Sequence, residues 1–373
     1  MSTTMRLDLH SDLHRAEPAD TTSLQRVPAK RRTALLEQDA PLLMQARASE
    51  GLTGGLVERC AAAGLGAIYA TTKTHDMVAL INRHQQLQAG PVLFDAERYA
   101  GKGRDGASGH LDPDWTAYQR RIGIQQPLTD SSYIAANNHA RLTAVLKEGA
   151  NQSKAITTLP LAKHWITNRA DELVDQINRF GNPVALMVED RNDPFATEAA
   201  VLGLLHVLAH ADVPVLQLRC DITAIGALAF GASHAAIGTS TSRRHIWPPT
   251  GGGPTKREPA AYVPASMSHR SLSTIGLAIP HFSDDLRLWT CDCDFCAGAT
   301  LDHIATETEA AMHSLHCLAS LAAKVIGNDP TVSARSWIEA CRHALSVNQE
   351  ISAKLVKNWP VPGNLKAWIK ATR

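Results

Sequence analysis

Short apolar segments, rich in β-branched residues, alternate with helix-like stretches along most of the chain. Eight segments of this kind predict strands at 41–46, 66–71, 91–95, 126–130, 154–159, 183–189, 214–218 and 235–239. Near-continuous apolar strands separated by helices are typical of a parallel sheet that is covered on both faces. We therefore expect an α/β protein of the (β/α)8 TIM-barrel class, with a doubly wound open sheet as the alternative.

Three regions follow from this pattern. Residues 1–39 form an N-terminal extension, 40–288 form the barrel, and 289–373 form a C-terminal subdomain with expected helices at 303–326, 333–345 and 348–357. Within the barrel region, residues 240–271 are rich in Pro, Gly and Ser and predict a long loop after the eighth strand.

Composition narrows the class of protein. Of 373 residues, 44% are apolar and 20% are charged, which is ordinary for a soluble globular protein. No apolar run approaches the roughly 20 residues that a membrane span requires, so no membrane association is expected. The seven cysteines are odd in number, and four of them are scattered through apolar stretches. This usage argues against a disulfide framework and indicates a cytoplasmic protein.

Three of the cysteines, Cys291, Cys293 and Cys296, follow the spacing C-x-C-x-x-C. Three thiolates on a tight turn and one further donor make a closed tetrahedral site, so we expect a structural Zn²⁺ in a zinc-binding helical subdomain. The sequence leaves the fourth ligand open among His303, His313, His316 and Cys317.

Charged residues stand at or just beyond the carboxyl ends of the predicted strands, where barrels place their reactive groups. A carboxylate there performs acid–base chemistry or binds the edge of a nucleobase. The alternative is that an aspartate ends a strand or caps the next helix. The candidates are Asp95, Asp130, Glu189, Asp190, Arg219, Arg243 and Arg244.

Basic residues are unevenly distributed although the net charge is only +1. Residues 351–373 contain five Lys and Arg and no acidic residue, and short basic pairs include Arg243-Arg244. Basic patches of this kind can bind along a phosphate backbone, which makes nucleic acid a candidate partner. The alternative is that these charges only solvate the exposed faces of helices.

The order of these features resembles the tRNA-guanine transglycosylase superfamily, zinc-stabilised barrels that exchange a guanine for a 7-deazaguanine, with relatives that modify DNA. The similarity runs over about 39–326. The run 91–95 resembles the segment whose aspartate is the general base, and 127–130 resembles the strand whose aspartate binds the incoming base. The resemblance thus implies a catalytic Asp95, a base-binding Asp130, and His316 as the fourth zinc ligand. It also implies pairing into a homodimer or heteromer through the zinc subdomain.

Departures from the family concern the reaction itself. Ala236 occupies the place of the nucleophilic aspartate that should close the eighth strand. If the protein is an enzyme, Asp190 or Asp95 replaces that carboxylate, or water attacks directly. Glu189, Arg219, Arg243 and Arg244 are then expected to contact the substrate.

Three hypotheses remain. The first is base exchange on guanine or 7-deazaguanine in tRNA or DNA. The second is a non-catalytic homologue that binds nucleic acid or supports an active partner subunit. The third is a small-molecule ribosyl enzyme that has kept the barrel, which suits the nearly neutral charge.

Overall fold

The computed structural model describes residues 29–30, 32–36, 40–101, 104, 109–249, 258–282, 284–355 and 359–373. Most of the predicted N-terminal extension and the centre of the predicted 240–271 loop lie outside these ranges.

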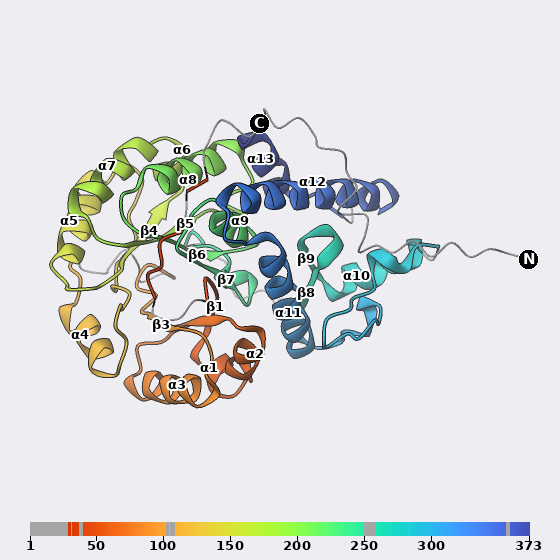
Figure 1. The fold of residues 1–373 in the computed structure, drawn as a ribbon, viewed down its shortest axis with the longest axis horizontal. Coiled ribbons are helices and arrows are strands. Elements are labelled where there is room, and N and C mark those ends of the chain that lie inside the picture. Colours follow the sequence, from red (N-terminus) through yellow and green to blue (C-terminus); the bar gives the residue numbers. More distant parts are fainter. Residues whose placement is uncertain are drawn as a thin grey trace, which may run out of the picture.

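A single curled sheet of seven parallel strands forms the centre of the molecule, with helices around it (Figure 1). The strands lie in the order β3-β2-β1-β7-β6-β5-β4. The first and last strands of this sheet along the chain, β1 and β7, are therefore neighbours, and Leu42 pairs with Ala235. The strands are β1 (Leu42–Arg47), β2 (Gly66–Ala70), β3 (Val92–Asp95), β4 (Thr157–Ala162), β5 (Val184–Glu189), β6 (Val215–Cys220) and β7 (His234–Gly238).

The predicted fourth strand, 126–130, is reduced to a parallel bridge between Leu128 and Ile156. Two backbone hydrogen bonds hold it there, from the Ile156 amide to the Pro127 carbonyl at 2.8 Å and from the Thr129 amide to the Ile156 carbonyl at 3.0 Å. Proline has no amide hydrogen to donate, which limits any further ladder. The α/β class and the parallel sheet are confirmed, and the strand order differs from that of a doubly wound sheet.

Helices cover the outside of the sheet because each has one apolar face. In α7 (Ala170–Phe180), for example, Leu173, Val174 and Ile177 are buried. The other sheet helices are α1 (Ala48–Leu52), α2 (Leu56–Ala63), α3 (Thr74–Leu87), α4 (Pro113–Arg121), α5 (His139–Ala150), α6 (His164–Thr167), α8 (Glu198–His210) and α9 (Thr223–Ala229).

The C-terminal part lies at one side of the sheet (Figure 1). It contains the antiparallel pair β8 (Ala260–Val263) and β9 (Ser268–Ser271), then α10 (Leu272–Ala278), α11 (Glu307–Val325), α12 (Pro330–Leu355) and α13 (Gly363–Ala371). The expectation of a loop throughout 240–271 is therefore wrong at its end, which forms a hairpin.

The two helices predicted at 333–345 and 348–357 belong to one helix, α12. Asn348, at the expected break, is fully buried and its amide group is satisfied within the helix and by its neighbours. Its Nδ2 donates to the carbonyls of Ala344 and Ser266, each at 2.7 Å, and its Oδ1 accepts from Trp359 Nε1 at 2.9 Å. An asparagine side chain often ends a helix because it competes for the hydrogen bonds of the backbone. Here Ser266 and Trp359 bind the side chain of Asn348, so the helix continues through it.

The last helix of the basic C-terminal segment, α13, packs against α8 and α12. Trp368 is buried between Phe230 and Trp337, with ring centroids 5.5 and 5.6 Å away. Its Nε1 donates to Thr223 Oγ1 at 3.3 Å, whereas Lys366 and Lys370 stay exposed. None of the helices in the described ranges combines the length and apolar character needed to cross a bilayer.

Replacing Trp368 with alanine is expected to lower the free energy of unfolding by about 3–5 kcal/mol, because a large buried ring leaves a cavity. Urea denaturation measures the change. Lys366→Ala on the exposed side of the same helix is the control, with an expected change within about 0.5 kcal/mol. Equal effects of the two substitutions would show that α13 is not packed as described.

Candidate metal centre and candidate active site

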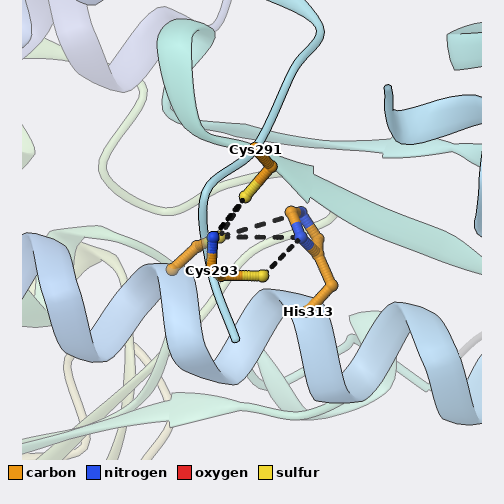
Figure 2. A group of neighbouring side chains, drawn as sticks. Cys291, Cys293 and His313 are labelled. Carbon is orange, nitrogen blue, oxygen red and sulfur yellow. Dashed lines mark hydrogen bonds between the residues drawn. The ribbon is translucent and has the colours of Figure 1, made fainter. Parts of the chain in front are cut away.

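A cluster of sulfur and nitrogen donors joins the cysteine loop to α11. Cys291, Cys293, Cys317 and His313 offer ligand atoms that all lie within 4.8 Å of one another. The Sγ atoms of Cys291 and Cys317 are 3.5 Å apart, and His313 Nδ1 lies 3.6 Å from Cys293 Sγ. Figure 2 shows Cys291 and Cys293 on the loop, facing His313 on the helix. The cluster can hold a metal ion.

The loop is shaped for this by its backbone. The Cys296 amide bonds to the Cys293 carbonyl at 3.0 Å, and the Cys293 amide points at Cys291 Sγ at 3.5 Å. Gly298 closes the turn with φ 87°, a conformation that glycine adopts without strain. An amide aimed at a sulfur stabilises a thiolate, as a metal ligand requires.

His313 is held in the orientation of a ligand. Its Nε2 lies 2.6 Å from the backbone carbonyl of Tyr262 in β8, and the residue is fully buried. Because a carbonyl only accepts, Nε2 carries the hydrogen and Nδ1 presents its lone pair to the sulfurs. A second partner that fixes the tautomer in this way is usual for metal-binding histidines.

The prediction that His316 is the fourth ligand is wrong. Its Nδ1 lies 3.7 Å from Asp294 Oδ2, and the side chain is 20% exposed. On an α-helix, residues four apart are separated by only about 40° around the axis. His313 and Cys317 therefore face the loop together, while His316 is turned to the side of that face.

Cys296 makes a fifth donor in the same place. Its Sγ lies 3.2 Å from His313 Nδ1, and the Cys317 Sγ lies 3.6 Å from the same atom. A tetrahedral ion takes four ligands, and the cluster offers five donors. Two sets are therefore possible: Cys291, Cys293 and His313 belong to both, and the fourth ligand is either Cys317 or Cys296.

The thiols do not ionise together without a cation. The hydrogen bond from Cys317 lowers the pKa of Cys291 to about 3, while that same bond raises the pKa of Cys317. Burial raises the pKa of Cys296, and the neighbouring sulfurs add to this. A divalent cation would supply the missing positive charge, so the residues present fit a soft metal ion.

Asp95 is the most enclosed of the predicted catalytic residues. It is 3% exposed at the end of β3, where Oδ2 accepts from Gln45 Nε2 at 2.9 Å and from the Tyr99 hydroxyl at 2.5 Å. Oδ1 accepts from the Glu97 amide at 2.9 Å. Burial raises the pKa of Asp95, and the charge of Glu97 acts in the same direction.

Arg219 and Arg243 reach the same place from the ends of β6 and β7. Arg219 donates to the Tyr99 hydroxyl at 2.9 Å and to Glu97 at 2.5 Å, and Arg243 donates to Glu97 at 2.7 Å. Arg219 and Glu97 both have positive φ, 54° and 50°, which costs free energy in non-glycine residues. We call Asp95, Glu97, Tyr99, Arg219 and Arg243 the strand-end network.

The sequence predicted three members of the strand-end network separately and missed Glu97 and Tyr99. Their position could have identified them, because both lie within four residues of Asp95, in the loop that follows its strand.

The remaining predicted residues have other partners. Asp130 accepts from Arg98 and from the Asp112 amide, and Glu189 accepts from Arg104 and from the Tyr133 hydroxyl. Asp190 is paired with Lys163 Nζ at 2.7 Å, and no described contact joins it to Asp95. Ala236 is buried within β7, whose five residues include no carboxylate.

Asp193, after β5, is a further group that the sequence did not single out. Burial raises its pKa from an ordinary value of 3.8 to about 7, although the Phe195 amide, 2.9 Å from Oδ1, favours the charged form. The folded state therefore prefers the protonated acid. The stability that this preference gives is present below about pH 4 and is lost as the pH rises through 7.

Asp193→Asn keeps an oxygen acceptor for the Phe195 amide but does not ionise. Its advantage in unfolding free energy over the wild type is expected to grow by on the order of 1–2 kcal/mol between pH 5 and pH 8. Chemical denaturation at the two pH values measures this. A constant difference would show that Asp193 titrates normally.

Comparisons with known proteins do not show a family. No protein-family model matches the chain, and no curated protein does. A solved structure of a spore coat polysaccharide biosynthesis protein from Bacillus subtilis is similar over 58% of this chain and 67% of its own, with 12% identity and a TM-score of 0.36. A likeness of this extent carries no inference about activity.

Proposed function

We propose that the chain is a divergent relative of the tRNA-guanine transglycosylases that acts on guanine or 7-deazaguanine bases in nucleic acid. In this proposal residues 126–130 stand as the fourth strand between β3 and β4, which completes a (β/α)8 barrel. The observation that carries the proposal is Asp95, a buried carboxyl group at a strand end that keeps its proton more readily than usual.

A protonated Asp95 suits cleavage of an N-glycosidic bond. The C–N bond breaks, its electron pair leaves with the base, and the base takes the proton of Asp95. Asp130 then binds the edge of the base, and Glu189, Arg219, Arg243 and Arg244 hold the rest of the substrate. Since β7 supplies no carboxylate, either the incoming base attacks the sugar carbon directly or Asp190 attacks first and is displaced by that base. The incoming base gives its N–H proton back to Asp95 as the new C–N bond forms. Attack by water would instead hydrolyse the bond and leave the sugar without a base.

Zn²⁺ is the metal that we propose for the cysteine cluster. Cys291, Cys293 and His313, with Cys317 or Cys296, give sulfur and nitrogen donors that suit a tetrahedral ion. Four protein ligands leave no open position, so the ion is structural. It fixes the loop to α11 and β8 and takes no part in base exchange.

Nucleic acid, either tRNA or DNA, is the proposed partner. Exposed Lys354, Lys366 and Lys370 on α12 and α13 add positive charge. A homodimer or heteromer through the zinc subdomain and a cytoplasmic location, consistent with seven free cysteines, belong to the same proposal.

A second candidate is a non-catalytic homologue that binds nucleic acid or supports an active subunit. The pairing of Glu97, Asp130, Glu189 and Asp190 with basic side chains favours it, because these ion pairs occupy the carboxylates.

Incubation of the full chain with tRNA or duplex DNA and radiolabelled guanine or 7-deazaguanine tests the proposed function. Incorporation of label into the polymer is expected. Binding of the polymer with no incorporation would favour the second candidate instead.

A further inference from the structure

A pocket of about 370 Å³ opens at the carboxyl ends of β1 and β7, between α2 and the start of α11. Its size falls within the range of small-molecule sites. Of the residues predicted from the sequence, only Arg244 lines it, and the members of the strand-end network do not. We call it the arginine pocket, after Arg47, Arg59 and Arg244 in its wall.

Arg244 is 9% exposed, yet its charge has no close counter-ion. Its one described hydrogen bond runs from Nε to the Gly238 carbonyl at 3.3 Å, and no carboxylate oxygen of the described residues lies within 4.0 Å. Asp221, whose charge acts on Arg244, is instead hydrogen-bonded to His269 at 3.1 Å. A buried guanidinium without an ion-pair partner is costly, so this arrangement favours an anionic ligand.

Arg59, on α2, also lines the pocket without an ion-pair partner among the described residues. Its Nε is buried and without a hydrogen-bond partner, and the guanidinium forms no ion pair within the described part of the chain. By contrast, Glu58, its neighbour on α2, is paired with Arg83. Two guanidinium groups thus line one pocket, and neither has a carboxylate oxygen of the described residues within 4.0 Å.

Hydroxyl groups also line the pocket. Ser240, Thr241 and Ser242 follow β7, and the Oγ atoms of Ser240 and Ser242 are 3.0 Å apart. The wall also contains three acids. Glu50 accepts from the Arg47 amide and Glu258 from the Ser273 amide, each at 2.9 Å, and Glu307 lies in the first turn of α11. Guanidinium and hydroxyl donors together match a tetrahedral phosphate, and in barrels the loops after the last strands frequently bind one.

We propose that the arginine pocket binds a phosphate group through Arg59, Arg244 and the hydroxyls that follow β7. The phosphate belongs either to a nucleotide or to the backbone of a nucleic acid. Phosphate binding itself does not depend on the proposed function. Only the identification of the phosphate-bearing molecule as a nucleotide or a nucleic acid rests on it.

Calorimetric titration of the full chain with inorganic phosphate, with guanosine monophosphate and with a short oligonucleotide, at constant ionic strength, tests the proposal. Arg59→Gln and Arg244→Gln are each expected to weaken binding by about tenfold, the effect of losing one charge-assisted contact. Arg287→Gln, an exposed arginine paired with Asp285 outside the pocket, is the control. Arg59 is only partly buried, so its variant remains informative if Arg244→Gln does not fold.

Weakened binding of phosphate and the monophosphate supports a nucleotide carrier. Weakened binding of the oligonucleotide alone, with a salt dependence reduced by about one phosphate contact, supports a polymer. Unchanged binding of all three ligands in both variants, or binding of none by the wild type, overturns the proposal. Asp95→Asn is expected to keep phosphate binding, so a failure of base exchange and a failure of this site are distinguishable.

Discussion

Replacing His313 with alanine is expected to weaken metal binding by at least about 100-fold and to unfold the cysteine loop, whereas His316→Ala retains the metal. The reason is geometric. His313 Nδ1 faces Cys293, Cys296 and Cys317, and its Nε2 is anchored to the Tyr262 carbonyl, while His316 faces Asp294. Elemental analysis of the purified variants measures zinc per chain, with about one expected in the wild type.

His316→Ala is a matched control for His313→Ala, because His316 lies on the same helix, α11, three residues after His313. Full zinc occupancy in His313→Ala, or its loss in His316→Ala, would contradict the described cluster. Cys293→Ser should also lose the ion because Cys293 belongs to both ligand sets. Comparison of Cys296→Ser with Cys317→Ser then identifies the fourth ligand, since only the true ligand is required for full occupancy.

Asp95→Asn is expected to reduce base exchange by about 10²–10⁴-fold, the usual contribution of a general acid. The amide keeps the size of the side chain but has no acidic proton to give. Incorporation of labelled guanine measures the loss. Asp212→Asn is the control, because Asp212 is an exposed carboxylate outside the strand-end network. Exchange at the wild-type rate in Asp95→Asn would exclude this residue from catalysis.

Tyr99→Phe gives a complementary result in the pH dependence of exchange. The Tyr99 hydroxyl donates to Asp95 and so favours the ionised carboxylate, which partly offsets the effect of burial on the pKa. Without this bond the pKa of Asp95 rises further. The alkaline limb of the rate profile, where the acid loses its proton, should move to higher pH.

The strand-end network shows why single positions were easier to predict than their partners. Asp95, Arg219 and Arg243 were found because each stands at or just after the end of an apolar segment, and that position follows from local pattern. Their connection depends on the order of strands in space. Glu97 bridges two arginines more than 120 residues away in sequence, and no periodicity reports such a distance.

The cluster of possible metal ligands illustrates the same limit on a smaller scale. The spacing of Cys291, Cys293 and Cys296 brings three sulfurs together through a short turn, so the cluster itself was predictable. The donor from α11 was not, because His313 and His316 both lie near the face that the loop approaches. The position of β8 decides between them, since its Tyr262 carbonyl orients His313.

The sequence by itself determined the α/β class, seven of the eight strands, the turn that brings three cysteines together and the strand ends that carry charge. These features arise from contacts between residues close along the chain, where alternation of apolar and polar positions is sufficient. Only the tertiary structure decided that 126–130 is a bridge, that α12 continues through Asn348, and that Arg59 and Arg244 meet at one pocket. Each of these depends on partners distant in sequence, whose burial and hydrogen bonds override the local preference.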